Sequence, residues 1–172
     1  MVYFVYMGGC MVFGYKCFNK DLTNRYGFKF DVGKTYGVSG EIKFGINGNG
    51  FHMCKNIEDT FRYYDAMEGE VSVCEVIGLG EFVSLYDEYN GYYDMYSVEM
   101  IKIIRLLSRE DIIEMALNFS EERVIRFIQL YRLTSSEIIL FKEKFKNYSS
   151  VIDNIIYYQE EDRDIFSRKL IR

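Results

Sequence analysis

His52 is the only histidine in the chain, so the sequence excludes metal sites with several histidines and leaves any histidine-based catalysis to this one residue. Strand alternation places His52 and Cys54 on one face of a predicted strand. A cysteine–histidine nucleophile needs the two side chains within hydrogen-bond reach and a thiol activated by the imidazole. Residues two apart on a strand splay too widely for this. We interpret His52 as a structural, hydrogen-bonded residue, and we expect no catalytic residue, metal site or cofactor.

Two other sequence patterns, the cysteine spacing and a glycine-rich segment, give only weak evidence for a ligand-binding site. The four cysteines contain no C-x-x-C pair, which favours reduced core thiols over a zinc ribbon; they are Cys10, Cys17, Cys54 and Cys74. The glycine-rich residues 45–50 lack the Gly-Lys-Ser/Thr ending of a phosphate-binding loop and lead into a strand, so they predict a turn.

Tyrosines and acidic residues are concentrated in residues 86–94. Tyrosine gives a large contact area at low entropic cost, and neighbouring acids favour a basic partner. The alternative is that the tyrosines form cross-strand aromatic pairs that stabilise a hairpin. The candidate partner-binding residues are Tyr86, Asp87, Glu88, Tyr89, Tyr92, Tyr93 and Asp94.

The first half of the chain must position these residues with short elements, because all 14 glycines lie at or before Gly91. Aromatic or alternating segments predict strands at residues 13–18, 27–30 and 71–76. Glu81–Tyr89 and Tyr92–Arg105 predict a hairpin around Asn90-Gly91, a dipeptide suited to a two-residue type I′ turn. Asn56 is predicted to cap a helix that reaches about Asp65.

The second half predicts four helices, each opened by a hydroxyl residue. These residues are Ser108, Ser120, Thr134 and Ser150, and Thr134 forms a capping box with Glu137. Helical spacing predicts core positions at Val124, Phe127, Ile128, Tyr131, Ile138, Ile139, Phe141 and Phe145. We therefore expect an α+β protein. A small antiparallel or mixed sheet with one helix occupies residues 1–107, and a helical array of about four helices occupies residues 108–172.

Composition narrows the function classes. A net charge of −5 argues against direct nucleic-acid binding, which relies on surplus Lys and Arg. The apolar opening segment is interrupted by Gly8-Gly9 well short of a membrane span. We expect a cytoplasmic protein without a membrane segment.

Five short motifs follow one another between Tyr15 and about Leu107. They are YKCFNKDL at residues 15–22, GKTY at 33–36, GFHMC at 50–54, FRYY at 61–64 and VIGLGE at 76–81. In this order and spacing the chain resembles a family of uncharacterised domains found in bacteria and their phages. The resemblance carries no activity, and it implies a phage or mobile-element origin.

A second resemblance concerns the strand at residues 50–53 and the helix ending in Tyr63-Tyr64, which are similar to the middle motif of ADP-ribosyltransferases. It implies an alternative NAD site, with a tyrosine stacked on nicotinamide and Glu99 as catalytic acid. That site comprises Phe51, His52, Tyr63, Tyr64 and Glu99. The first strand of that fold offers Arg or His to the cofactor, whereas this chain has YKCF at residues 15–18. The departure favours a version of the fold without enzymatic activity.

Three hypotheses of function follow. The first is a non-catalytic inhibitor or modulator of a host macromolecule, anti-CRISPR-like, whose partner is a basic nuclease or other nucleic-acid-binding effector. The second is an ADP-ribosyltransferase-like enzyme that uses NAD. The third is an assembly module whose helical tail forms a homodimer.

The first hypothesis predicts that Tyr92→Ala combined with Tyr93→Ala weakens partner capture without changing the fold, because the two rings would be anchors of the interface. A tagged pull-down from host lysate with mass spectrometry measures the capture, and circular dichroism controls for the fold. Unchanged capture by the double variant would remove this surface from the hypothesis.

Overall fold

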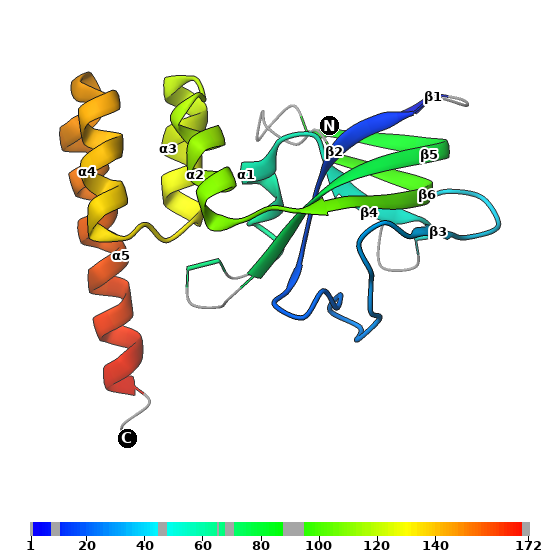
Figure 1. Cartoon of the computed structure of the whole chain (residues 1–172), viewed down its shortest axis with the longest axis horizontal. Helices are drawn as coiled ribbons and strands as arrows, with labels where there is room; N and C mark the ends of the chain where they lie inside the picture. Colours follow the sequence, from blue (N-terminus) through cyan, green and yellow to red (C-terminus); the bar gives the residue numbers. More distant parts are fainter. Residues whose placement is uncertain are drawn as a thin grey trace. The chain divides into compact units, whose positions relative to one another are not determined.

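A computed structural model describes residues 2–7, 11–44, 48–64, 66–67, 71–87 and 95–169, with only the backbone described at 2–7, 85–87 and 162–169. The chain divides into two compact units, Met1–Ser108 and Arg109–Arg172 (Figure 1). The first unit is an antiparallel sheet with a short helix, and the second is helical. The predicted α+β class is confirmed. No described helix combines the length and apolar character needed to cross a membrane.

Among its described residues the first unit has a sheet of six strands, and each pairing between them is antiparallel. The elements are β1 (Val2–Met7), β2 (Val12–Asn19), β3 (Thr35–Gly37), β4 (Phe51–Cys54), α1 (Ile57–Thr60), β5 (Val71–Asp87) and β6 (Met95–Leu106). One edge of β5 pairs first with β2 and then with β1, and its other edge pairs with β6. The far edge of β6 pairs with β4 and β3. The sheet then closes on itself through a single β2–β4 residue pair, Tyr15 opposite Cys54.

The β5–β6 pairing differs by one residue from the register that an uninterrupted hairpin with a two-residue turn would have, and Asn90-Gly91 itself lies outside the described residues. A two-residue turn at Asn90-Gly91 would set Phe82 opposite Glu99, whereas the structure pairs Phe82 with Val98. Both of these side chains are buried, so the observed register keeps apolar residues on the core face. The register of β5 against β6 shifts between Leu79 and Phe82, and within this shift Gly80 has φ +80°. There the Glu99 carboxylate accepts a hydrogen bond from the Glu81 N–H at 3.0 Å.

The core of the first unit lies inside the closed sheet. It contains Phe18, Phe30, Met53, Cys74, Val76, Phe82, Val98, Ile101 and Ile103. Gly78 of β5 is packed into this core without room for a side chain. A Cβ atom there would lie 2.6 Å from Val98 Cγ1 and 2.7 Å from Val12 Cγ2. Close packing of this kind fixes the spacing of β5 against its two neighbours.

Helix α1 is shorter than predicted and ends at Thr60 instead of near Asp65, which lies outside the described residues. The Thr60 hydroxyl donates to the Ile57 carbonyl at 2.6 Å, and the Tyr63 N–H bonds back to the Thr60 carbonyl. Such competing bonds favour turns over continued helix. Asn56 precedes the helix without a side-chain cap bond, and its amide instead bonds Asp59 at 3.3 Å.

The second unit contains four α-helices and one short 3₁₀ helix among its described residues. They are α2 (Arg109–Leu117), α3 (Glu121–Leu130), α4 (Ser135–Lys144), η1 (Lys146–Tyr148) and α5 (Ser149–Lys169). The Thr134–Glu137 capping box forms as predicted. The core positions predicted in and just after α3 are all buried; they are Val124, Phe127, Ile128 and Tyr131. Ile139, however, is 58% exposed, because at 100° per residue it lies about 200° around α4 from the buried Phe141.

Arg109 ties the beginning of α2 to the beginning of α4. Its guanidinium forms two hydrogen bonds with the Glu137 carboxylate, at 2.8 and 2.7 Å, and a third with the Arg132 carbonyl at 2.7 Å. It also lies 5.1 Å from the centre of the Tyr131 ring. Burial alone would raise the pKa of Glu137, but the bonds from Arg109 and from Thr134 hold that pKa below its ordinary value. This cation therefore has a complete set of partners.

We expect Gly78→Ala to lower the free energy of unfolding by about 1–3 kcal/mol, because the added methyl overpacks the core. Gly37→Ala is the matched control within a strand, since a Cβ there meets the flexible Met100 side chain at 3.3 Å. It should change stability by less than about 0.5 kcal/mol. Urea denaturation measures both, and equal losses would contradict the assigned packing.

We also expect Glu137→Gln to destabilise the protein by about 1–3 kcal/mol at pH 7, because a charged hydrogen-bond partner of Arg109 is lost. The folded-state pKa of Glu137 is lowered. Its stabilisation is therefore complete above the ordinary glutamate pKa and disappears as the pH falls through the folded value. The difference between wild type and variant should shrink below pH ~4. The exposed Glu143→Gln on the same helix is the control, and a pH-independent difference would refute this role.

Candidate functional site

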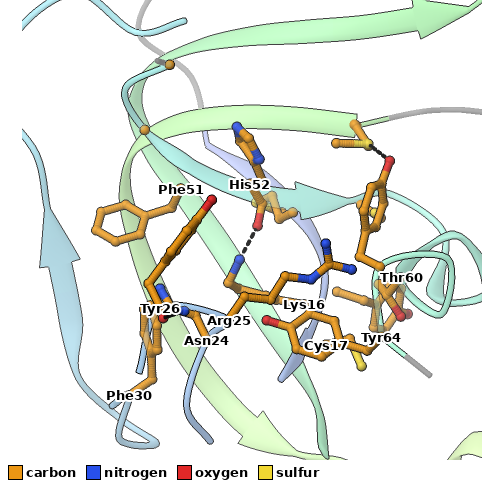
Figure 2. Close-up of a pocket in the computed structure, with 17 residues that line it drawn as sticks. Lys16, Cys17, Asn24, Arg25, Tyr26, Phe30, Phe51, His52, Thr60 and Tyr64 are labelled. Carbon is orange, nitrogen blue, oxygen red and sulfur yellow. Dashed lines mark hydrogen bonds between the residues drawn. The ribbon is translucent and has the colours of Figure 1, made fainter. Parts of the chain in front are cut away.

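A pocket of about 360 Å³ opens in the first unit beside the contact between β2 and β4 (Figure 2). Its lining comes from β2, the loop that follows β2, the residues that lead into β4, β4 itself, the end of α1 with the turn after it, and the beginning of β6. Their principal lining residues are Tyr15, Lys16, Cys17, Asn24, Arg25, Tyr26, Phe51, His52, Met53, Cys54, Tyr63 and Tyr64. Segments distant in the chain thus meet at one cavity.

The β2–β4 contact is narrow, and this creates the pocket. Gly14 lets the backbone of β2 approach the Cys54 carbonyl so closely that a Cβ atom would clash with it. The strands pair only at Tyr15 and Cys54. Beyond this pair the backbones of β2 and β4 are not paired. There the Lys16 ammonium donates a hydrogen bond to the His52 carbonyl at 2.6 Å.

Lys16 occupies an inward-facing position of β2. Alternation places it on the same face as the fully buried Phe18, and its Nζ lies 5.6 Å from the centre of that ring. Burial lowers the pKa of Lys16 to about 8. Among the described residues no carboxylate forms a salt bridge with it. An ionisable side chain at a core-facing position is a candidate functional group.

The loop after β2 supplies a second cation. The Asn24 carboxamide oxygen accepts hydrogen bonds from the backbone N–H groups of Tyr26 and Phe28, both at 2.9 Å, and so holds a tight turn. Arg25 projects from this turn into the pocket, where its guanidinium lies 5.5 Å from the centre of the Tyr64 ring. Figure 2 shows Arg25 between Lys16 and Tyr64.

His52 and the cysteines are not arranged as a nucleophilic pair. Burial raises the pKa values of Cys17 and Cys54 to about 12, so both thiols are protonated at neutral pH. The His52 side chain is exposed by surface area, and its ring lies 5.2 Å from that of Phe44. Partial desolvation of the imidazole, and then the charge of Lys16, lower the pKa of His52. His52 is therefore largely neutral at pH 7.

The structure brings together four of the five residues of the alternative NAD site. Phe51, His52, Tyr63 and Tyr64 all line the pocket. Glu99 is not among the lining residues, because its carboxylate is directed to the backbone N–H of Glu81 at the irregularity of β5. In the part of the chain that the structure describes, the lining contains neither Asp nor Glu.

Sequence reasoning overlooked Lys16 and Arg25. Lys16 did carry a signal, since it is a charged residue at an alternating position in the aromatic strand that ends in Phe18. Arg25 carried none, because only the folded loop directs it to the pocket.

The predicted partner-binding segment is described only at its beginning. Tyr86 and Asp87 form the end of β5, of which only the backbone is described there. Glu88, Tyr89, Tyr92, Tyr93 and Asp94 lie outside the described residues. Their assignment as a binding surface stays a prediction. Among the described residues, no group of three His, Cys, Asp or Glu side chains could hold a metal ion.

Comparison with known proteins places the pocket within a family. No curated protein and no solved structure matches the chain significantly. A family model described as a domain of unknown function, DUF7666, matches residues 12–115, which is more than half of the chain. The match contains every lining residue of the pocket. The predicted membership of an uncharacterised family is confirmed, and the chain belongs to the DUF7666 family of domains of unknown function.

Proposed function

We propose that the first unit binds a small anionic ligand with a flat ring, of the size and chemistry of a mononucleotide. The observation that carries this proposal is the lining of the pocket, which combines the cations Lys16 and Arg25 with aromatic rings and, in its described part, includes no carboxylate.

The distribution of charge supports an anionic ligand in this pocket. The chain carries a net charge of −5, yet the pocket gathers positive groups. Removing an ammonium from water is unfavourable unless an opposite charge or good hydrogen bonds compensate for it. The Lys16 ammonium bonds a neutral carbonyl, that of His52. A phosphate or carboxylate of a ligand would supply the missing counter-charge, and Arg25 would add a planar donor for it.

The aromatic residues that line the pocket support a ligand with a planar ring. Tyr15, Tyr26, Phe51, Tyr63 and Tyr64 line the pocket from four different segments. Aromatic faces stack on nucleobases and similar rings, with about 1–3 kcal/mol per base in single-stranded nucleic-acid complexes. Tyr26 is 91% exposed, so much of its surface is available to a ligand.

The size of the pocket favours one ring and one phosphate over a dinucleotide. Ligand pockets span roughly 300–1,000 Å³, and this one, at about 360 Å³, lies at the lower end of that range. An ADP-ribosyltransferase-like reaction would also need an acid near the glycosidic bond, and Glu99 lies outside the lining. Binding without turnover is therefore the function that we favour over the NAD-dependent alternative.

Ligand capture is compatible with the hypothesis of a phage- or element-encoded modulator of a host macromolecule. A protein that sequesters a small anionic effector modulates the macromolecule that this effector controls. The anti-CRISPR-like role and the contact with a basic partner through residues 86–94 stay predictions of the sequence.

Isothermal titration of the full chain with AMP, GMP, CMP and UMP tests the proposal, with the corresponding uncharged nucleosides and NAD as comparisons. We expect at least one mononucleotide to bind at least about tenfold more tightly than its nucleoside. We expect Lys16→Met to reduce that affinity at least about tenfold, the equivalent of about 1.4 kcal/mol. Because the pKa of Lys16 is about 8, its charge is lost as the pH rises through that value, and affinity should fall between pH 7 and pH ~9.5.

Lys43→Met is the matched control, because Lys43 is an exposed lysine of the same unit that pairs with Glu41 at 2.7 Å. Circular dichroism verifies that each variant is folded. No binding of any mononucleotide at millimolar concentration would refute the proposal. An equal loss of affinity in Lys16→Met and Lys43→Met would refute the role of the pocket.

A further inference from the structure

We propose that Lys16 is a nucleophilic amine that forms an imine with a ligand carrying both an aldehyde and an anionic group. This inference rests on the proposed function, because it assigns a ligand class to the same pocket. It adds a covalent step to the anion binding described above: for this step Arg25 holds the anionic group of the ligand, and the neutral form of Lys16 reacts with the aldehyde.

The position of Lys16 supports a reacting amine. Its side chain enters the pocket from the inward face of β2, beside the ring of Phe18. The chain has 26 acidic residues, yet none of those that the structure describes forms a salt bridge with Lys16. Arg109 of the second unit, by contrast, bonds Glu137 through two nitrogens. A carboxylate would hold Lys16 in the charged form, whereas the His52 carbonyl accepts only a hydrogen bond.

The protonation state supports the same inference. Burial lowers the pKa of Lys16 to about 8. At pH 7 roughly one amine in ten is then neutral, compared with fewer than about one in a thousand for an ordinary lysine. Lysines whose pKa is lowered by their surroundings act as Schiff-base nucleophiles for this reason.

The reaction balances without a further reagent. The amine lone pair attacks the aldehyde carbon, and a proton moves from nitrogen to the former carbonyl oxygen to form a carbinolamine. Loss of that hydroxyl with the second amine proton releases one water and leaves the carbon–nitrogen double bond. Solvent can carry these protons, because the pocket is open and the His52 imidazole points away from the Lys16 amine in Figure 2.

The remaining lining residues match the rest of such a ligand. Arg25 lies beside Lys16 in Figure 2 and would hold the anionic group. Phe51 and Tyr26 lie on the other side of Lys16 and would flank the carbon skeleton. An aldehyde bound in this way meets the amine at high effective concentration.

Pyridoxal 5′-phosphate is the probe, because it joins an aldehyde, a flat ring and a phosphate. The full chain is incubated with it at pH 8, reduced with borohydride and mapped by peptide mass spectrometry. We expect labelling of Lys16 at least about tenfold faster than labelling of Lys43. Lys16→Arg should abolish this label. Pyridoxine 5′-phosphate, which lacks the aldehyde, should slow the labelling without adding mass.

The outcomes separate the two proposals. Labelling of Lys16 no faster than that of Lys43 would overturn the imine, whatever the titration with mononucleotides shows. Rapid labelling that a binding mononucleotide slows supports both proposals. Rapid labelling in a protein that binds no mononucleotide supports the imine and refutes the mononucleotide proposal.

Discussion

The close approach of β2 to β4 at Gly14 is the constraint on which the first unit depends. Because position 14 has no side chain, the backbone of β2 reaches the Cys54 carbonyl, and the sheet closes through one residue pair. Closure encloses the core around Phe18 and Met53. The strands pair no further, so the space beyond the contact admits the Lys16 side chain and opens into the pocket. One steric condition therefore produces both the core and the candidate site.

Arg109 and Lys16 differ in their partners, and this difference separates a structural role from a candidate functional one. Arg109 is bound by a carboxylate, a carbonyl and an aromatic ring, which is the arrangement of a cation that stabilises a fold. Lys16 has a carbonyl and a ring, without a described carboxylate. An incompletely compensated charge at a pocket is unfavourable in the free protein and becomes favourable when a ligand supplies the opposite charge.

Three of the five short motifs between Tyr15 and Leu107 lie in segments that line this pocket. YKCFNKDL contains the end of β2 with Lys16, GFHMC contains β4, and FRYY supplies Tyr63 and Tyr64. VIGLGE contains Gly78, which packs in the core, and Gly80, which sets the irregularity of β5. These four motifs therefore contribute either to the core of the first unit or to the lining of its pocket.

The sequence alone determined the helices of the tail, the Thr134–Glu137 cap and the strand segments at residues 13–18 and 71–76, because periodicity and capping act over a few residues. The strand predicted at residues 27–30 is wrong, since Lys29 forms only an isolated bridge with Thr23. The sequence also indicated Phe51, His52, Tyr63 and Tyr64 as neighbours. Only the tertiary structure decided the pairing of Phe82 with Val98, the exclusion of Glu99 from the pocket, and the convergence of Lys16 with Arg25. These features depend on which distant segments meet and in what register, and burial of the whole core selects among registers that are equally compatible with the local pattern.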